Sequence, residues 1–258
     1  WPLSKQKLEA AHALVKRELD LGHLEESLSP WNAPIFVIPK KEPGKFRLLH
    51  DLRAINAVMR PFGPLQPGLP IPSAIPVHWP IVILDIKDCF FSIPLAQQDR
   101  ERFAFTLPAI NLGSPVRRYQ WTVLPQGMKN SPTICQRAVH LALEPLRAQL
   151  SEALIYHYMD DLLLAAPTLG QVNKIEHAVI QQLNQEGLYI QETKVQRGSQ
   201  SRYLGLIVSP LKVTVAPIKL SPEIKTLHDV QVLVGALQWV RPIVGLPTST
   251  LVPFYELL

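Results

Sequence analysis

The sequence predicts an α+β fold in which an antiparallel sheet is backed by helices. Amphipathic segments with a helical period are mixed along the chain with short apolar strands, and several strands are paired as hairpins. The chain has 258 residues, of which 47% are hydrophobic and 18% charged, as in globular proteins with a sizeable core. Proline contributes 25 residues, about twice the usual share of ~5%, which predicts short segments joined by rigid turns.

The first 60 residues predict one helix and one hairpin. Apolar side chains recur at helical spacing over 4–21, with a serine at the N-cap position and a glycine after the last turn. Strands over 35–38 and 46–49 flank the sequence Glu-Pro-Gly-Lys at 42–45, which is typical of a turn. The hairpin that these two strands would form carries basic side chains near its tip.

The rest of the chain predicts strands and helices around a proline-rich connector. Residues 61–80 hold seven prolines and predict an extended segment. The other boundaries follow from apolar periodicity and from glycine and proline positions. In chain order we expect a strand over 81–84, two strands in FAFTLPAI and RRYQWTVLP, a loop over 125–132, a helix over 133–149, a hairpin over 155–165, a helix over 169–186, a strand pair in RYLGLIVSP and LKVTVAP, and helical segments over 224–240 that end at Pro242.

The charge of the chain gives a weak indication of an anionic partner. The net charge is +5 and the pI is about 9.2. The basic residues gather in three clusters, which fit either a basic channel assembled by the fold or ordinary solvated surfaces. These clusters are Lys40, Lys41, Lys45 and Arg47; Arg117 and Arg118; and Lys194, Arg197 and Arg202.

Other features argue against several protein classes. No apolar run reaches the ~18 residues of a transmembrane helix, and the N-terminal sequence WPLSKQKLEA lacks the apolar core of a signal peptide. Cys89 and Cys135 lie in apolar surroundings without a Cys-His cluster, which disfavours a structural zinc and fits a reducing compartment. The abrupt start at Trp1 is typical of a fragment of a longer polypeptide.

The sequence IYHYMDDLLLAAP places two adjacent aspartates, Asp160 and Asp161, inside an apolar hairpin. Two neighbouring carboxylates in such surroundings need a compensating cation. Asp85, at the end of another apolar strand, adds a third carboxylate if the two strands are neighbours. Three carboxylates without histidine suit Mg²⁺ or Mn²⁺. A polar turn is the common alternative, and calcium is a weaker one because no EF-hand pattern is present.

Several motifs together resemble the reverse transcriptase family. The sequence YMDD at 158–161 resembles the signature of that family, and five further segments resemble its other motifs in the expected order. They are VIPKKEPGKFRLLHDLRAIN, ILDIKDCFFSIPL, LPQGMKNSP, RYLGLIV and LVGALQWVRPIVGLPT. The wording of the motifs is most similar to betaretrovirus-like polymerases, including endogenous retroviral ones. The resemblance covers nearly the whole chain and implies a right-hand polymerase.

The resemblance also implies a role for each motif position. Asp85, Asp160 and Asp161 would hold two Mg²⁺ ions, with Mn²⁺ as an alternative, and Lys194 would protonate the departing pyrophosphate. Phe90 would be the aromatic gate against a 2′-hydroxyl, although it also fits an ordinary core position. The remaining positions are Lys40, Lys41, Arg47 and Gln126 for the dNTP, Tyr158 and Met159 for the primer end, and Leu204 and Gly205 near the primer grip. Asp88 is not expected to bind metal, and His157 is expected to be a packing residue.

The resemblance implies a division into fingers, palm and thumb. The fingers would span 1–60 and 95–125, the palm 61–94 and 126–218, and the thumb 219–258, without a connection or ribonuclease H domain. The implied activity is RNA-directed DNA synthesis on an RNA or DNA template, with a primer duplex, an RNA–DNA hybrid and dNTPs as partners and no membrane. The protein would be cleaved from a polyprotein and found in the cytoplasm or the virion.

Three alternatives remain open from the sequence. One is a non-catalytic polymerase-like subunit that binds nucleic acid, and another is an inactive endogenous retroviral relic. A third is an RNA-copying RNA polymerase, which Phe90 disfavours because such an enzyme must accept a ribose.

Overall fold

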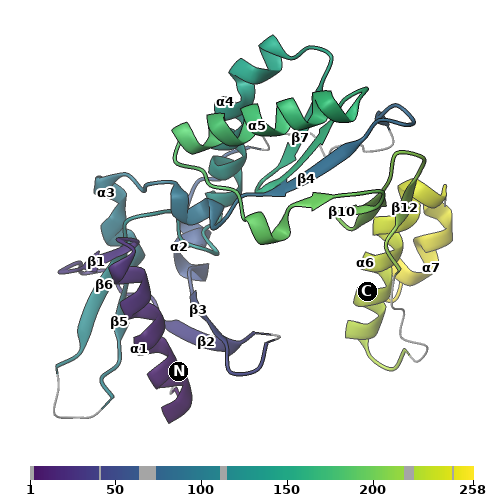
Figure 1. Cartoon of the computed structure of the whole chain (residues 1–258). Coiled ribbons are helices and arrows are strands. Elements are labelled where there is room, and N and C mark those ends of the chain that lie inside the picture. Colours follow the sequence, from purple (N-terminus) through teal and green to yellow (C-terminus); the bar gives the residue numbers. More distant parts are fainter. Residues whose placement is uncertain (1–2, 41, 64–73, 111–114, 218–223, 246) are drawn as a thin grey trace.

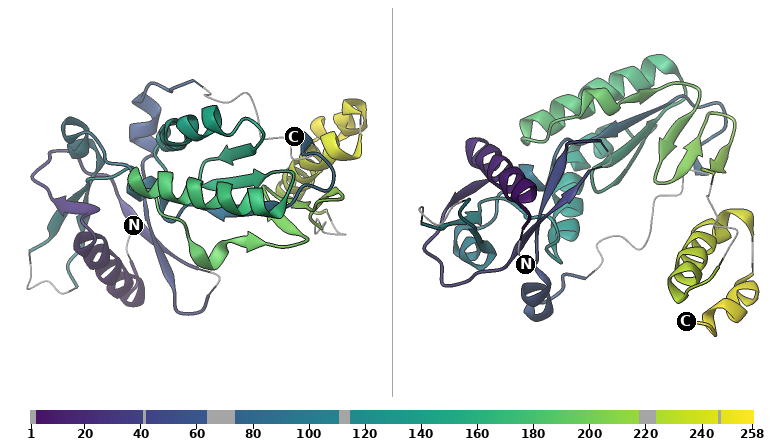
Figure 2. Two further views of the ribbon diagram at one scale, coloured as in Figure 1. Left: turned by 45° about the horizontal axis from the view of Figure 1, so that its top comes forward. Right: turned by 90° about the horizontal axis from the view of Figure 1, so that it is seen from below.

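The computed structural model describes residues 3–40, 42–63, 74–110, 115–217, 224–245 and 247–258, with the backbone alone at 242–244. The described residues form an N-terminal part around helix α1, a central sheet with two covering helices, and a C-terminal pair of helices (Figure 1). Both turned views place the C-terminal helices on the opposite side of the molecule from α1 (Figure 2). The α+β class predicted from the sequence is confirmed.

The central sheet carries the aspartates. Its strand order is β7-β8-β4-β9, and all three pairings are antiparallel. The strands are β4 (Ile81–Asp85), β7 (Leu154–Tyr158), β8 (Asp161–Ala165) and β9 (Gln196–Arg197). Strands β4 and β8 lie side by side, as the sequence required for Asp85 to approach the Asp160–Asp161 pair.

Strands β4 and β8 are buried on both faces of this sheet, which explains why each is a continuous apolar run. Val82, Leu84 and Leu164 face helices α4 (Ser131–Gln149) and α5 (Leu169–Gln185). The alternate side chains of the same strands contact a second sheet on the opposite face. That second sheet has the order β10-β11-β12 and consists of β10 (Ser201–Tyr203), β11 (Leu206–Val208) and β12 (Val213–Val215).

The N-terminal part has its own core. Helix α1 (Lys5–Asp20) begins where the Ser4 hydroxyl accepts a hydrogen bond from the Lys7 N–H. Buried aromatic side chains from the adjoining strands fill the space beneath it, and the rings of Phe91 and Trp121 stack 5.3 Å apart. The other elements are β1 (Leu24–Glu26), β2 (Ile35–Pro39), β3 (Phe46–His50), α2 (Arg53–Val58), the 3-10 helix η2 (Cys89–Ser92), α3 (Gln97–Arg100), η3 (Glu101–Phe103), β5 (Ala104–Leu107) and β6 (Arg117–Trp121).

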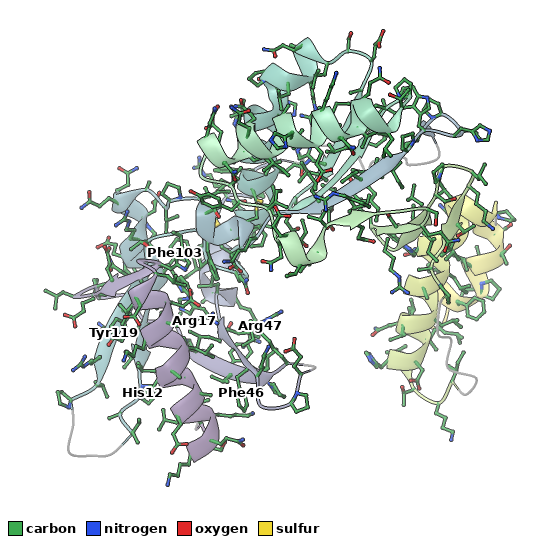
Figure 3. The ribbon with its side chains drawn as sticks, in the orientation of Figure 1. His12, Arg17, Phe46, Arg47, Phe103 and Tyr119 are labelled. Carbon is green, nitrogen blue, oxygen red and sulfur yellow. The ribbon has the colours of Figure 1, made fainter. Side chains whose placement is uncertain are left out.

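The expected hairpin in this part is confirmed. Strands β2 and β3 pair from Ile35↔His50 to Pro39↔Phe46, and Phe46 and Arg47 project from β3 (Figure 3). Strands β5 and β6 also pair, with β1 on the other side of β6. Part of the proline-rich connector, residues 64–73, lies outside the described residues.

The chain from residue 201 onward corrects two expectations. The segment RYLGLIV is not one strand, because Leu204 and Gly205 both have positive φ, 47° and 77°, and turn the chain between β10 and β11. Pro242 does not end the helix, since α6 runs over Leu227–Val244. The 3-10 helix η5 (Thr248–Leu251) and α7 (Val252–Tyr255) follow. No helix in the described residues is long and apolar enough to cross a membrane.

Candidate active site

The three predicted acids meet at one end of the central sheet. Asp85, the last residue of β4, is the register partner of Asp161, the first residue of β8. Tyr158 pairs with Asp161 across the hairpin, so the connecting turn consists of Met159 and Asp160. The sequence placed both aspartates at the tip. The structure corrects this, since Asp161 belongs to the strand and only Asp160 to the turn.

The turn is held in an unusual backbone conformation. Met159 has a φ of 58°, a region that non-glycine residues enter at a cost. Its N–H donates a 2.6 Å hydrogen bond to the Gln136 side-chain oxygen on α4. The Asp160 carbonyl accepts a 2.8 Å hydrogen bond from the Ile86 N–H, which ties the turn to the residue after β4. These two contacts fix Asp160 relative to Asp85.

The carboxylates destabilise one another's charged form. Burial raises the pKa of Asp161 to about 6, and the nearby charges of Asp160 and Asp85 add to the rise. Burial also raises the pKa of Asp160, with repulsion from Asp85 as a further cause. Solvent weakens this effect at Asp160, whose side chain is exposed. A cation among these groups would therefore be strongly favoured.

In the structure, Lys194 supplies part of that positive charge. Its Nζ donates to both carboxylate oxygens of Asp85, at 2.8 and 2.9 Å, from the short 3-10 helix η4 (Glu192–Lys194). The hydrogen bond to Asp85 is the main reason that the pKa of Lys194 is raised. A raised pKa makes an ammonium a weaker proton donor for as long as this pair persists.

The donor set fits a hard divalent cation in its chemistry. Asp85, Asp160 and Asp161 offer only carboxylate oxygens, the ligands that Mg²⁺ and Mn²⁺ prefer. Within the described part of the chain, no three His, Cys, Asp or Glu side chains are already gathered closely enough to hold an ion by themselves. The residues present suit the metal by charge and ligand type, and water or substrate oxygens would complete its coordination.

A cavity of about 260 Å³ opens beside the aspartates. It brings together residues from the β2–β3 hairpin, β4, η2, the loop over 125–130 and η4. Six of the sequence-predicted residues line it: Arg47, Asp85, Phe90, Gln126, Asp160 and Lys194. The described lining does not include Lys40, Tyr158, Met159, Asp161, Leu204 or Gly205. Lys41 lies outside the described residues.

The loop that carries Gln126 is fastened to α2. The Asn56 side chain donates to the Gly127 carbonyl and accepts from the Lys129 N–H, both at 2.8 Å. These contacts hold the loop that carries the cavity residue Gln126. Sequence reasoning missed Asn56, Gln136 and the cavity residue Gln191, because a polar residue in a helix or loop carries no signal of its tertiary partner.

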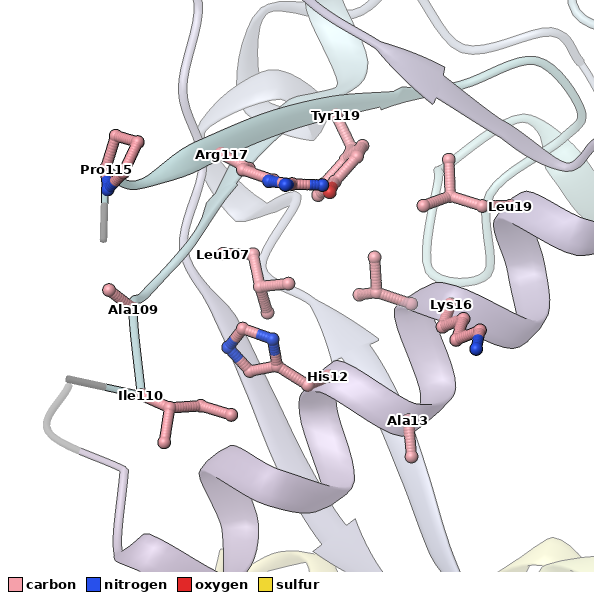
Figure 4. A pocket seen from close by; sticks show the side chains of 11 residues that line it. His12, Ala13, Lys16, Leu19, Leu107, Ala109, Ile110, Pro115, Arg117 and Tyr119 are labelled. Carbon is pink, nitrogen blue, oxygen red and sulfur yellow. The ribbon is translucent and has the colours of Figure 1, made fainter. Parts of the chain in front are cut away.

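Two of the larger cavities lie away from the aspartates. One, of about 710 Å³, is lined by His12 and Lys16 of α1 and by Arg117 and Tyr119 of β6 (Figure 4). The other, of about 850 Å³, follows α5 and includes the buried Glu176 paired with Arg197. The described lining of the first has no carboxylate, and that of the second has Glu176, paired with Arg197, and Glu192, so size alone does not locate the chemistry.

Comparison with known proteins matches two family models to this chain. The model described as "Reverse transcriptase (RNA-dependent DNA polymerase)" matches residues 38–208, which are 171 of the 258 residues. The model described as "Reverse transcriptase thumb domain" matches residues 215–258. The first match contains every candidate site residue that the sequence predicted.

Curated relatives align over the whole chain. It is 53% identical to the Gag-Pol polyproteins of Rous sarcoma virus subgroup C (strain Prague) and of avian leukosis virus subgroup A (isolate RSA). It is 48% identical to the Gag-Pro-Pol polyprotein of mouse mammary tumor virus (strain BR6). The chain spans 15–16% of the length of these polyproteins. On these matches, the chain belongs to the reverse transcriptase (RNA-dependent DNA polymerase) family.

Proposed function

We propose that this chain is the polymerase region of a retroviral-type RNA-directed DNA polymerase, which extends a primer with dNTPs on an RNA or DNA template. The observation that most supports this is the junction of Asp85, Asp160 and Asp161 beside a cavity that also contains Arg47, Phe90 and Gln126 in a chain of this family. Carboxylates that can hold metal ions, beside the Arg47 guanidinium that can bind phosphate and the Phe90 ring, suit nucleotidyl transfer.

The three aspartates would hold the metal ions. Two Mg²⁺ ions, or Mn²⁺, would supply activation of the primer 3′-hydroxyl and neutralisation of the triphosphate when bound. Asp85 and Asp160 would contact both ions, with Asp161 as the third acid. When metal binds, Lys194 would give up its pairing with Asp85. It would then protonate the departing pyrophosphate, a role that the pairing with Asp85 seen in the structure opposes.

The cavity residues would position the nucleotide. Arg47, with Lys40 or Lys41, would bind the triphosphate from the hairpin, because a guanidinium pairs with two phosphate oxygens at once. Phe90 would close the space that a 2′-hydroxyl needs, which favours dNTPs. Gln126 would contact the sugar and base of the incoming nucleotide, with its loop fastened by Asn56.

The duplex would lie across a right-hand arrangement of fingers (1–60 and 95–125), palm (61–94 and 126–218) and thumb (219–258). The thumb-domain match over 215–258 supports a thumb at the C-terminal end of this division. Tyr158, Met159, Leu204 and Gly205 would contact the primer. Affinity for the primer–template, including an RNA–DNA hybrid, would fall with salt because phosphate contacts dominate it. The chain would be released from a Gag-Pol-type polyprotein and act in the cytoplasm or the virion.

Primer extension on an RNA template with dNTPs tests the proposal. The wild-type chain should extend the primer with Mg²⁺ or Mn²⁺, and Asp160→Asn should abolish extension. Asp88→Asn is the matched control, because Asp88 lines the same cavity but is not expected to hold metal, and asparagine tolerates its positive φ of 46°. Equal activity of wild type and Asp160→Asn would refute the assigned metal site.

A non-catalytic role in binding nucleic acid is the second candidate. A folded chain that binds primer–template with a salt-dependent affinity but extends no primer would favour it. The raised pKa of Asp161, caused first by burial and then by the charges of Asp160 and Asp85, is more typical of a catalytic or metal-binding site and so favours the first candidate.

A further inference from the structure

Two buried cysteines meet at the wall of the nucleotide cavity. Cys89 lies in η2 and Cys135 in α4, 46 positions apart in the sequence, and their Sγ atoms are 2.7 Å apart. The exposed fractions of these residues are 5% and 0%. Both are free thiols, and both line the cavity of about 260 Å³ that contains Asp85 and Asp160.

Each cysteine is next to a residue on which the proposed active site depends. Cys89 precedes Phe90 and follows Asp88, the residue before η2, which has a φ of 46°. Cys135 precedes Gln136, whose side chain holds the turn of Met159 and Asp160. A bond between the two sulfurs would therefore join the gate segment directly to the helix that fixes the catalytic turn.

We propose that Cys89 and Cys135 are an oxidative modification site, at which a small peroxide converts the two thiols into a disulfide. The loss of polymerase activity that we expect from this bond rests on the proposed function, whereas the bond itself does not. The proposal stands on the proximity of two thiols from different elements and on their access to a cavity.

The reaction balances with hydrogen peroxide as the only oxidant. One cysteine attacks a peroxide oxygen as its thiolate, the O–O bond breaks, and the thiol proton passes to the departing hydroxide, so that a sulfenic acid and one water form. The second thiol then attacks the sulfenic sulfur, the S–O bond breaks, and a disulfide and a second water form. The two cysteines lose two electrons and two protons in total, and one peroxide is reduced to two waters.

The surroundings determine which reagents can react. The contact with Cys135 and burial raise the pKa of Cys89, so the thiolate is scarce, and both peroxide and alkylating reagents, which react with the thiolate, should act slowly. Peroxide is small enough to enter through the cavity. A dNTP bound in that cavity would cover the thiols, so nucleotide should slow the oxidation.

The bond would change the shape of the site. A disulfide sets its sulfurs at about 2.05 Å, so the 2.7 Å contact must shorten, which shifts the Cys89 and Cys135 side chains and the residues packed beside them. Displacements of this kind next to Phe90 and the 159–160 turn should lower the rate of nucleotide addition roughly ten- to hundredfold. Thiol reductants would restore it.

The test treats the chain with hydrogen peroxide and follows two readouts. Peptide mass spectrometry should find one cross-linked peptide pair containing Cys89 and Cys135, and its yield should fall when dNTP and primer–template are present. Primer extension should fall in parallel and recover with dithiothreitol. Cys135→Ala is the matched control, since it keeps Cys89 and all three methionines. Compared with its own untreated sample, it should form no cross-link and lose less activity.

Each result bears on the proposal separately from the polymerase assignment. Oxidation of either cysteine to sulfinic acid without a cross-link would overturn the proposal. A cross-link that leaves primer extension unchanged would overturn the expected loss of activity. An untreated chain without extension would refute the proposed function, while the cross-link would still decide whether the modification site exists.

Discussion

At the scale of single residues, the position of Asp160 depends on Gln136. Met159 adopts a φ of 58°, and a non-glycine residue in that region costs about 1–3 kcal/mol. Gln136 occupies a buried position of α4, which restricts its movement. Its side-chain oxygen accepts a hydrogen bond from the Met159 N–H. The hydrogen bond therefore offsets part of the cost of the turn.

Replacing Gln136 with methionine should loosen this turn. Methionine has a similar length but cannot accept the hydrogen bond in the same way, so the variant should lose about 1–2 kcal/mol of unfolding free energy. Its primer-extension rate should also fall, because Asp160 loses its fixed position. Urea unfolding and single-nucleotide extension measure the two effects.

A second substitution separates the turn from other effects of Gln136. Glycine adopts positive φ without strain, so in a Met159→Gly background the Gln136→Met substitution should cost less stability than in the wild type. An equal cost in both backgrounds would show that Gln136 does not act through the turn.

The sequence revealed the acids but not the residues that hold them. Asp85, Asp160 and Asp161 stand out because each interrupts or ends an apolar strand, and the meeting of β4 and β8 bears out that expectation. Gln136 gave no such signal, because a glutamine in an amphipathic helix is equally compatible with a solvent-facing position. Only the packing of α4 against the hairpin assigns it a partner.

At the scale of elements, the turn between β10 and β11 shows where pattern reading fails. The sequence RYLGLIV predicts one strand because its residues are mostly apolar and Leu-Gly is not among the common hairpin turns. Tyr203 pairs with Leu206, which leaves Leu204 and Gly205 as a two-residue turn with both φ values positive. This is the type I′ pattern, which matches the twist of the flanking strands.

Gly205 is also where α6 contacts the second sheet. A Cβ at Gly205 would lie 3.0 Å from the Trp239 ring, and its φ of 77° disfavours any side chain. Gly205→Ala should therefore lower the unfolding free energy by about 1–3 kcal/mol and loosen α6 from the sheet. Thermal unfolding and protease cleavage near α6 measure these effects.

Gly198→Ala is the control for that variant. Nothing lies within 4 Å of a Cβ built at Gly198, and no positive φ is recorded there. This substitution should leave the unfolding temperature nearly unchanged. Destabilisation of equal size by both substitutions would show that neither the backbone conformation nor the Trp239 contact is responsible.

At the scale of the whole molecule, each of two separate cores contains a buried histidine. His50 packs in the N-terminal core with its ring 5.4 Å from that of Phe105. His157 lies under α4, where Arg147 donates to Nδ1 at 2.8 Å and Nε2 lies 3.2 Å from the Gln136 carbonyl. The sequence predicted His157 to be a packing residue, and its burial bears this out, whereas nothing in the sequence distinguished His50.

Both histidines are held neutral. Burial lowers the pKa of His50 to about 4. Burial and the nearby Arg147 lower the pKa of His157 to about 4, with a smaller effect from His140. Since an unfolded histidine titrates near 6.5, the unfolded chain binds more protons between pH 6.5 and 4. The stability that each histidine contributes is thus fully present above pH 6.5 and is lost as the pH falls toward 4.

The dependence of stability on pH should therefore change when His157 is replaced. Each neutral histidine adds a slope of up to about 1.4 kcal/mol per pH unit in this window, while Asp161, with its pKa raised to about 6, acts in the opposite direction. The wild-type slope is a balance of these terms, but its difference from His157→Gln isolates one of them. Glutamine can still hydrogen-bond to Arg147 and to the Gln136 carbonyl without titrating.

In metal-free urea unfolding from pH 7 to 4.5, the His157→Gln variant should lose less stability on acidification than the wild type. Parallel curves for the two proteins would show that His157 is protonated equally in the folded and unfolded chains, and that its burial does not keep it neutral.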